Sequence, residues 1–480
     1  MATIGSSNFT VMRYQEEVAD SDAGYTAGVA IKELPMTGES FQYSSQFISS
    51  QNINSSRQIS DQIQTSYEVS GGLQVEFAPK IYDDFIEGAM WADWQATAKD
   101  NIAYTASFAV AVNATVDGGT LTDDSARGTI GTGIEIGQWI SVREVTGVGA
   151  PVSGNVQIYK VKSKTANTLT FAVATQVGTT ETTKTVKVAA SMVRAPRNGE
   201  DAYMKRHKYF FERQHADVNP AQYFGFGGNL VNNWSVNGAS ASLLTGSFDF
   251  MGETASVCND NTYDTDTNPN GNGVGSLATL DGAGFTAADT FNGFNAVSHI
   301  KGIYLDGVNV NKSAGGDIYI QSLDFTLANN LRGVQAMGYM GNIAVQAGQL
   351  GVTGNIASYF ANDKMYRRFI DGDEFSLEYV VENEAGDGYV FSFPRVTIST
   401  SGMNAGGTDQ DLIENMQWTA LYDSTLMTSM QVDRLYVAYS TKGYSPGWDD
   451  GQTYWNDATI DLYWDNVMTV LWNTQIDKVI

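Results

Sequence analysis

Tyr82-Asp83-Asp84-Phe85-Ile86-Glu87-Gly88 returns 284 positions later as Tyr366-Arg367-Arg368-Phe369-Ile370-Asp371-Gly372, so the pattern Tyr-x-x-Phe-Ile-acid-Gly occurs twice. Residues 54–57 are similar to residues 329–332, and residues 224–226 are similar to residues 391–393 at an offset of 167. The difference between the offsets of 284 and 167 predicts 117 extra residues in the first copy. A chain with two copies of one module can build a ring from half as many subunits, which favours an architectural role.

The composition is that of an acidic globular protein with few charges. The 480 residues are 42% apolar, which is enough for several cores. Charged residues make up only 17%, yet the net charge is −25. This balance disfavours tight binding to phosphate backbones, because such binding depends on Lys and Arg. It fits a solvating exterior, or a cavity that should not hold an anionic polymer.

Compartment signals are few. Cys258 is the only cysteine, so no intrachain disulfide is predicted. The N-terminal residues lack the basic and apolar regions of a signal peptide. No apolar run approaches the roughly 18 to 20 residues of a membrane span, so we predict no contact with a membrane.

Residue periodicity indicates a mainly β protein. Residues 41–78 are predicted to form strands, with alternation visible over residues 73–77. Phe85, Ile86, Ala89 and Met90 share one face of a predicted short helix, and the second copy repeats that helix after Asn362 or Asp363.

The extra residues of the first copy are rich in Thr and Val and contain stretches of period two. These stretches are residues 134–136, 139–142, 156–161, 169–173 and 186–188. About five strands with glycine turns predict a small β-barrel or sandwich, inserted as its own domain.

The chain therefore divides into six predicted parts. They are an N-terminal arm (1–40), a first module (41–94 plus 206–252), an inserted β-rich domain (95–205), a linker (253–299), a second module (300–440) and an aromatic C-terminal segment (441–480). Each module is predicted to carry one flanking short α-helix.

The sequence offers no convincing catalytic, cofactor or metal site, and we predict none. In Gly443-Tyr444-Ser445-Pro446-Gly447, a nucleophile elbow would need the backbone N–H that Pro446 lacks. Asp264–Asn268 opens like a calcium loop, but Pro269 replaces the required glycine. His215 and Asp217 have no Cys/His partner cluster, and Gly225–Gly228 lacks the last glycine of a dinucleotide fingerprint.

The two copies of the helix carry opposite charges. Asp83 and Asp84 in the first copy stand where Arg367 and Arg368 stand in the second. Two independently solvated helix faces would explain this. The alternative, which we adopt as a hypothesis, is that these residues meet across subunits and set their register.

The order and spacing of several segments resemble a bacteriophage major tail tube protein of the long, non-contractile type. The resemblance rests on Ser49–Gly88, Phe224–Leu230 and Thr245–Gly252 in the first copy, and on Leu327–Leu331, Gly351–Gly354 and Phe393–Val396 in the second. It leaves out the inserted domain and the aromatic tail.

The resemblance implies two tail-tube β-sandwich or barrel modules and a structural virion protein that is not an enzyme. It implies homotrimeric rings of six modules, stacked into a conduit through which viral DNA passes without specific binding. It also implies assembly in the host cytoplasm with tail tip or baseplate, tape measure and tail terminator proteins. A β-rich, glycan-binding, adhesin-like surface protein would share the Thr, Asn and Gly content and is the alternative.

Overall fold

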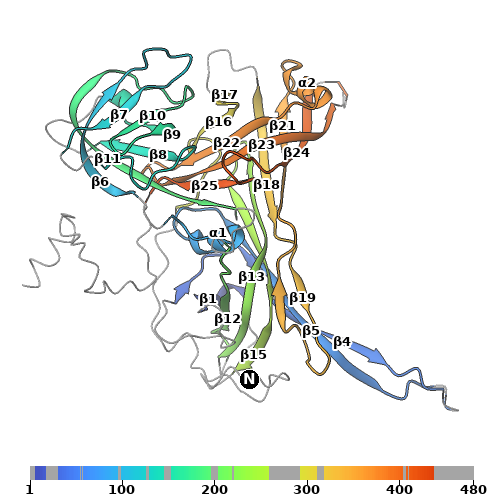
Figure 1. The fold of residues 1–480 in the computed structure, drawn as a ribbon. Coiled ribbons are helices and arrows are strands. Elements are labelled where there is room, and N and C mark those ends of the chain that lie inside the picture. The colour runs from blue at the N-terminus through green and yellow to red at the C-terminus, as the bar shows by residue number, and fades with distance from the viewer. Residues whose placement is uncertain are drawn as a thin grey trace, which may run out of the picture. The chain divides into compact units, whose positions relative to one another are not determined.

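The computed structural model describes residues 6–17, 31–53, 56, 58–95, 99–125, 129–144, 153–195, 204–218, 221–258, 292–310, 318–403, 407–408 and 410–436 (Figure 1). They all belong to one compact unit of the chain, residues 1–439. Within these ranges the fold is mainly antiparallel β, as predicted, with two short α-helices, α1 (Asp83–Met90) and α2 (Lys364–Asp371). The aromatic segment 441–480 and most of the linker lie outside the described residues.

The first module is built from six main strands in the spatial order β1-β12-β13-β14-β5-β4. Their bounds are β1 (Thr10–Glu16), β4 (Gln42–Ser49), β5 (Gln62–Glu76), β12 (Tyr209–His215), β13 (Gln222–Ala239) and β14 (Thr245–Gly252). Short strands β2 (Lys32–Glu33), β3 (Gly38–Glu39) and β15 (Thr254–Cys258) pair with β1, β5 and β13.

The second module repeats this arrangement in the order β16-β22-β23-β24-β21-β18. Its main strands are β16 (Ile300–Leu305), β18 (Tyr319–Ala328), β21 (Gly351–Tyr359), β22 (Phe375–Glu382), β23 (Gly388–Met403) and β24 (Ile413–Ala420). Shorter strands are β17 (Val308–Asn309), β19 (Arg332–Val334), β20 (Ala344–Gln346) and β25 (Gln431–Arg434). The duplication predicted from the sequence is therefore present in the strand pairing.

Equivalent positions in the two modules carry matching residues. Gly71 of β5 and Gly354 of β21 occupy the same place in the pairing, each beside a phenylalanine: Phe41, just before β4, or Phe325 of β18. A Cβ atom on Gly71 would lie 2.3 Å from the Cα of Phe41, and one on Gly354 would lie 2.2 Å from the carbonyl oxygen of Asp324. Close backbone approach thus requires glycine at both places.

A bulge fixes the correspondence of the two longest strands. The register of β13 against β14 shifts between Val231 and Asn233, and the register of β23 against β24 shifts between Ile398 and Thr400. These positions are 167 residues apart, the offset that the sequence repeat predicts downstream of the insertion. Bulges are features of a family's sheet rather than defects, so the two strands share one ancestral geometry.

The helices correspond less closely than the sequence repeat predicts. Both have eight residues and end at a left-handed residue, Trp91 after α1 and Gly372 after α2. Their bounds differ by about one turn relative to the repeated motif, because α1 begins one residue after Tyr82 whereas α2 begins two residues before Tyr366. The helical face predicted to be apolar is buried in α1, whereas α2 buries only Met365.

Strand pairing joins the two modules. The last residues of β13 pair with β18 from Asn233 opposite Ala328 to Ala239 opposite Ser322. One continuous hydrophobic core lies behind both modules. Trp234 is central to it, because its ring contacts Phe248 of the first module and Phe325 and Phe391 of the second.

The extra residues of the first copy form a closed six-stranded antiparallel barrel. Its strands are β6 (Lys99–Ala109), β7 (Thr120–Asp123), β8 (Trp139–Glu144), β9 (Ile158–Lys164), β10 (Thr168–Phe171) and β11 (Glu181–Arg194). They pair in the cycle β6-β7-β10-β9-β8-β11, and the interior is a separate hydrophobic core. The predicted strand at residues 134–136 is instead irregular and leads into a turn at residues 136–137, where the φ of Gly137 is +84°.

Candidate assembly surface

Two sheet edges lie open at the ends of the paired strands. The far end of β23, from Thr400 to Met403, pairs on one side with β24. The equivalent end of β13 pairs on one side with β14 and on the other with β18. Strand β4 pairs with β5 along one side, whereas its counterpart β18 has a strand on both sides. Within the described residues, β23 and β4 therefore each offer an edge that an additional strand can join.

The open edges are also exposed. Ser399, Thr400 and Gly402 are exposed, and a Cβ atom on Gly402 would meet nothing within 4 Å among the described atoms. Tyr43 and Phe47 of β4 are 41% and 54% exposed. Long edges that carry apolar side chains pair readily with another chain, so these two edges are candidate contacts between subunits.

A single polar face runs across the sheet of both modules. Side chains on the opposite face alternate with it and are buried, as Val236, Phe325 and Trp418 are. The polar face carries Gln74, Glu76, Asn233, Ser235, Asn237, Thr245, Ser247, Asp249, Ser322, Asp324, Thr326, Thr353, Asn355, Asn415, Gln417, Thr419 and Thr400. Three of these described residues are acidic and none is basic.

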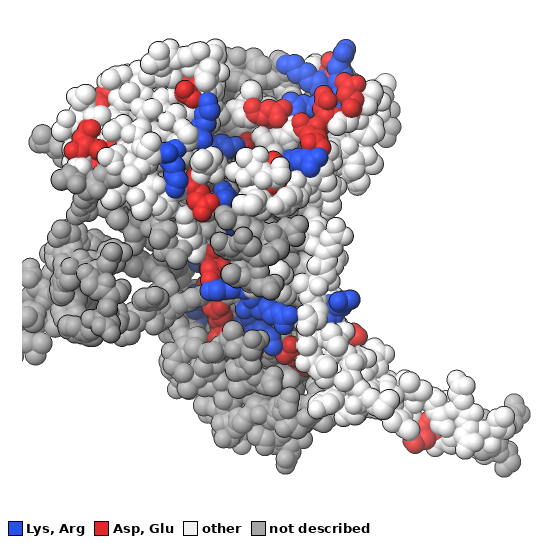
Figure 2. Space-filling model, viewed as in Figure 1, with Lys and Arg blue, Asp and Glu red and all other residues white. Residues whose placement is uncertain are grey.

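Two of the three acidic residues of this face accept hydrogen bonds from their neighbours. Asp324 Oδ1 accepts hydrogen bonds from the backbone N–H of Asn355, at 3.1 Å, and from its side-chain amide, at 2.8 Å. Asp249 Oδ2 accepts one from the amide of Asn233 at 3.3 Å. In the view of Figure 2, charged side chains of both signs gather near α2.

Asp83 lies in a buried junction between the modules rather than on a helix surface. Its Oδ1 atom accepts hydrogen bonds from the hydroxyls of Tyr389, at 2.6 Å, and Tyr436, at 2.8 Å. Its Oδ2 atom pairs with Arg434 at 3.0 Å, and the Arg434 guanidinium also lies over the ring of Trp94. Burial and the Asp83 carboxylate raise the pKa of Tyr389 and Tyr436 well above the ordinary value, so both hydroxyls stay protonated as donors.

The other three residues predicted to meet across subunits lie apart from Asp83. Asp84 Oδ2 pairs with Lys32 at 2.6 Å and accepts a hydrogen bond from Tyr14. Arg367, whose side chain is 72% exposed, pairs with Asp363 in the same helix at 2.6 Å. Arg368 pairs with Asp306 at 2.6 Å. The described chain does not bring the four together, and their contact across subunits stays a prediction; for Asp83 such a contact would require its buried pair to open.

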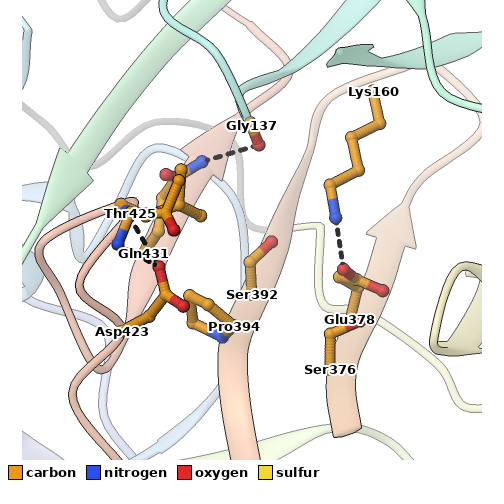
Figure 3. Close-up of a pocket in the computed structure, with 10 residues that line it drawn as sticks. Gly137, Lys160, Ser376, Glu378, Ser392, Pro394, Asp423, Thr425 and Gln431 are labelled. Carbon is orange, nitrogen blue, oxygen red and sulfur yellow. Dashed lines mark hydrogen bonds and ion pairs between the residues drawn. The ribbon is translucent and has the colours of Figure 1, made fainter.

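The barrel touches the second module along a separate contact. Arg143 of β8 donates hydrogen bonds to the carbonyl oxygens of Gly386 and Leu435. Lys160 of β9 pairs at 2.5 Å with Glu378 of β22, which is 1% exposed. Figure 3 shows Lys160 and Glu378 pointing toward one another beside a cavity of about 230 Å³.

A second buried carboxyl group lies at this contact. Asp433 of β25 is fully buried, and burial raises its pKa to about 7, although a hydrogen bond from Gln431 at 2.7 Å opposes the shift. A carboxyl group with such a pKa is partly protonated near neutrality, because desolvation disfavours its charged form. Sequence reasoning did not find this residue, since a short Gln-Val-Asp-Arg strand carries no sign that its aspartate is buried.

The rejected motifs have ordinary structural places where they are described. His215 Nδ1 lies 3.2 Å from the hydroxyl of Thr10, and Asp217 accepts a hydrogen bond from the backbone N–H of Ser6. Gly225–Gly228 lies inside β13, as a glycine-rich strand. The search of the described ranges finds no group of three or more His, Cys, Asp or Glu placed to hold a metal ion. The segments at 264–268 and 443–447 lie outside these ranges.

Comparison with known proteins agrees with this architecture. Residues 10–420 match the family described as phage tail tube protein, so the chain belongs to the phage tail tube family. That family is structural, and its members are components of the virion tail. No curated protein matches the chain. None of the described helices is long and apolar enough to span a bilayer.

Proposed function

We propose that this chain is the major tail tube subunit of a phage with a long non-contractile tail. Three chains close into a ring of six modules, and rings stack into a conduit for viral DNA. One observation carries the proposal. The strand pairing that joins the two modules inside the chain has an unpaired counterpart at each edge of the described sheet, β4 at one edge and the far end of β23 at the other. Identical head-to-tail contacts of this kind close into a ring when the rotation permits.

The internal contact supplies the register of the proposed contact between chains. Asn233–Val236 of β13 pairs with Phe325–Ala328 of β18. By the matching bulges and glycines, Thr400–Met403 is equivalent to the first segment and Phe41–Ser44 to the second. The proposed ring therefore pairs Ser401 of one chain with Tyr43 of the next, because Trp234 pairs with Leu327 inside the chain.

The exposed surface of α2 is the second proposed contact. Helix α1 is buried against the second module through Asp83, Tyr389 and Arg434. The equivalent position for α2 lies against the first module of the next chain. Exposed Arg367 and the nearby Arg368 are the contact residues we propose there, with Asp83 and Asp84 as the proposed contacts on the side of α1, where both also form ion pairs within their own chain.

The polar face described above is the proposed lumen wall. Its Ser, Thr, Asn and Gln side chains solvate passing DNA, and its three acidic residues repel phosphates. The absence of Lys and Arg from the described residues of this face supports passage without binding, since cationic contacts supply most non-specific affinity for DNA.

The remaining assignments extend this proposal. The six sequence divisions given above, from the arm at 1–40 to the segment at 441–480, are the proposed domain boundaries, with the strands β1, β2, β3 and β15 of the arm and linker added to the sheet of the first module. Tail tip or baseplate, tape measure and tail terminator proteins are the proposed partners. Assembly takes place in the host cytoplasm before the tube enters the virion.

Electron microscopy of the purified chain at increasing concentration, with and without tail tips as nuclei, tests the proposal. We expect rings or tubes with threefold symmetry and six similar lobes. Chains that remain monomeric under both conditions and bind a glycan on a screen would overturn the proposal in favour of the adhesin-like alternative.

A further inference from the structure

The barrel is inserted in the first module but is attached to the second by a shared strand. β25 pairs on one side with the end of β11, from Ser191 opposite Arg434 to Arg194 opposite Gln431. On its other side β25 pairs with β23, from Tyr389 opposite Arg434 to Ser392 opposite Gln431. A barrel strand thus continues into the sheet of the second module, which is a firmer attachment than a tether at the surface.

Side chains strengthen this attachment in two ways. Trp139 of the barrel forms a small buried cluster with Val380, Val390 and Leu435. Arg143 and the Lys160–Glu378 pair add hydrogen bonds and charge on either side of that cluster. Because Glu378 is buried, loss of Lys160 would leave an uncompensated charge at the contact.

The root of the barrel is fixed to the first module at the same time. The indole of Trp94 donates to the carbonyl oxygen of Asp83 in α1, and the backbone N–H of Trp94 donates to the Glu87 carboxylate at 2.7 Å. Next to it, the backbone N–H of Gln95 donates to the carbonyl oxygen of Met192 in β11. The barrel therefore holds α1 at one end and β22, β23 and β25 at the other.

We infer that the inserted barrel is a brace that fixes the angle between the two modules of one chain. Paired strands alone permit a range of twist of about 10 to 35° between neighbours, so this angle depends on contacts beyond the pairing of β13 with β18, namely the shared core, the Asp83 junction and the barrel. A third body attached to both modules removes that freedom. The inference rests on the proposed function in one respect. In a ring of identical two-module chains, each chain contributes two rotations around the ring, and the angle between its own modules is one of them.

Lys160→Glu is the variant that tests the brace, because it places two carboxylates against each other at the contact. Lys162→Glu is the matched control: Lys162 lies two residues along the same strand and pairs with Asp117 inside the barrel. Lys160→Glu combined with Glu378→Lys restores an opposite pair. Amide exchange of residues 431–434 reports docking of the barrel. Spin labels at Gln74 and Asn415, in a Cys258→Ser background, report the angle between the modules.

For Lys160→Glu we expect about tenfold faster exchange in β25 and a broader distance distribution, both reversed by Glu378→Lys and absent in Lys162→Glu. Rings formed by Lys160→Glu should vary in the number of subunits. Unchanged exchange in Lys160→Glu, or faster exchange with an unchanged distance distribution, overturns the brace. If the unaltered chain forms no rings, the tube proposal fails, and the distance measurement still decides the brace.

Discussion

The Oδ2 atom of Asp83 lies 3.0 Å from Nη1 of Arg434, a residue 351 positions later in the chain. Side-chain exposures of 6% and 9% make this a buried ion pair. It ties α1 of the first module to the last described strand of the second. Two tyrosine hydroxyls complete the coordination of the carboxylate, so the pair is both charged and hydrogen-bonded.

Asp83→Asn should therefore destabilise the folded chain strongly. Breaking one side of a buried pair leaves the Arg434 charge without compensation, and such changes cost about 3 kcal/mol. Denaturant unfolding monitored by tryptophan fluorescence measures the difference. Asp363→Asn, which removes the exposed partner of Arg367, is the control and should leave the midpoint unchanged. Equal effects of the two substitutions would contradict the assigned junction.

The stability of the chain should fall as pH rises toward neutrality because of Asp433. Its pKa is raised from 3.8 to about 7 on folding, so between these values the folded state binds a proton that the unfolded state has released. The contribution of Asp433 to the free energy of unfolding is fully present below pH 3.8, declines above it and is lost as pH passes through about 7. Each unit of difference between the folded and unfolded pKa corresponds to about 1.4 kcal/mol.

Asp433→Asn should remove that dependence of stability on pH. Relative to the unaltered chain, the variant should gain more stability at pH 8 than at pH 5. Midpoints of urea unfolding at pH 5 and pH 8 measure this difference in stability. Asp249→Asn, at an exposed position, is the control for loss of a negative charge. A variant whose pH slope equals that of the unaltered chain would show that Asp433 does not titrate in this range.

The proposed register predicts a specific crosslink between chains. With Ser401→Cys and Tyr43→Cys in a Cys258→Ser background, oxidation of assembled protein should give covalent dimers and trimers on a denaturing gel. Disulfides form only when the Cα atoms lie within about 7 Å. Ser401→Cys with Gln46→Cys is three residues out of register and should crosslink poorly. Efficient crosslinking of this control would refute the register.

Arg367→Asp should impair assembly without altering the fold. The residue is exposed and its described ion pair lies within α2, so reversing its charge leaves the core intact. If α2 packs on the next chain, the reversed charge disrupts that contact. Sedimentation velocity measures assembly and circular dichroism measures folding. Normal assembly of Arg367→Asp, and of Arg367→Asp with Arg368→Asp, would remove these residues from the interface.

Positive charge on the polar face should make the tubes bind DNA. Asn237→Lys with Asn355→Lys places two cations on the proposed lumen wall, and each phosphate contact adds a salt-dependent increment of affinity. Retention of short duplex DNA at low salt measures the effect. Thr182→Lys with Ala166→Lys, on exposed barrel positions, is the control. Stronger retention by the control would place the polar face outside the lumen.

Local sequence patterns predicted much of the architecture correctly. The apolar face of α1 is visible as Phe85, Ile86, Ala89 and Met90, because helical periodicity depends only on neighbours in the chain. The alternation of β5 and the duplication were visible for the same reason. Periodicity failed at residues 134–136, where a turn that ends at Gly137 interrupts an apparent strand. It also did not give the bounds of the helices, because α1 begins after Tyr82 whereas α2 begins before Tyr366.

The sequence by itself determined the mainly β class, the two short helices and the repeat. Only the tertiary structure decided which strands are neighbours, that the insertion closes into a barrel, and that Asp83 lies in a buried junction rather than on a surface. The physical reason is that alternation defines two faces of a strand without naming the partner or the buried side. Those choices depend on contacts between residues hundreds of positions apart, such as Asp83 and Arg434.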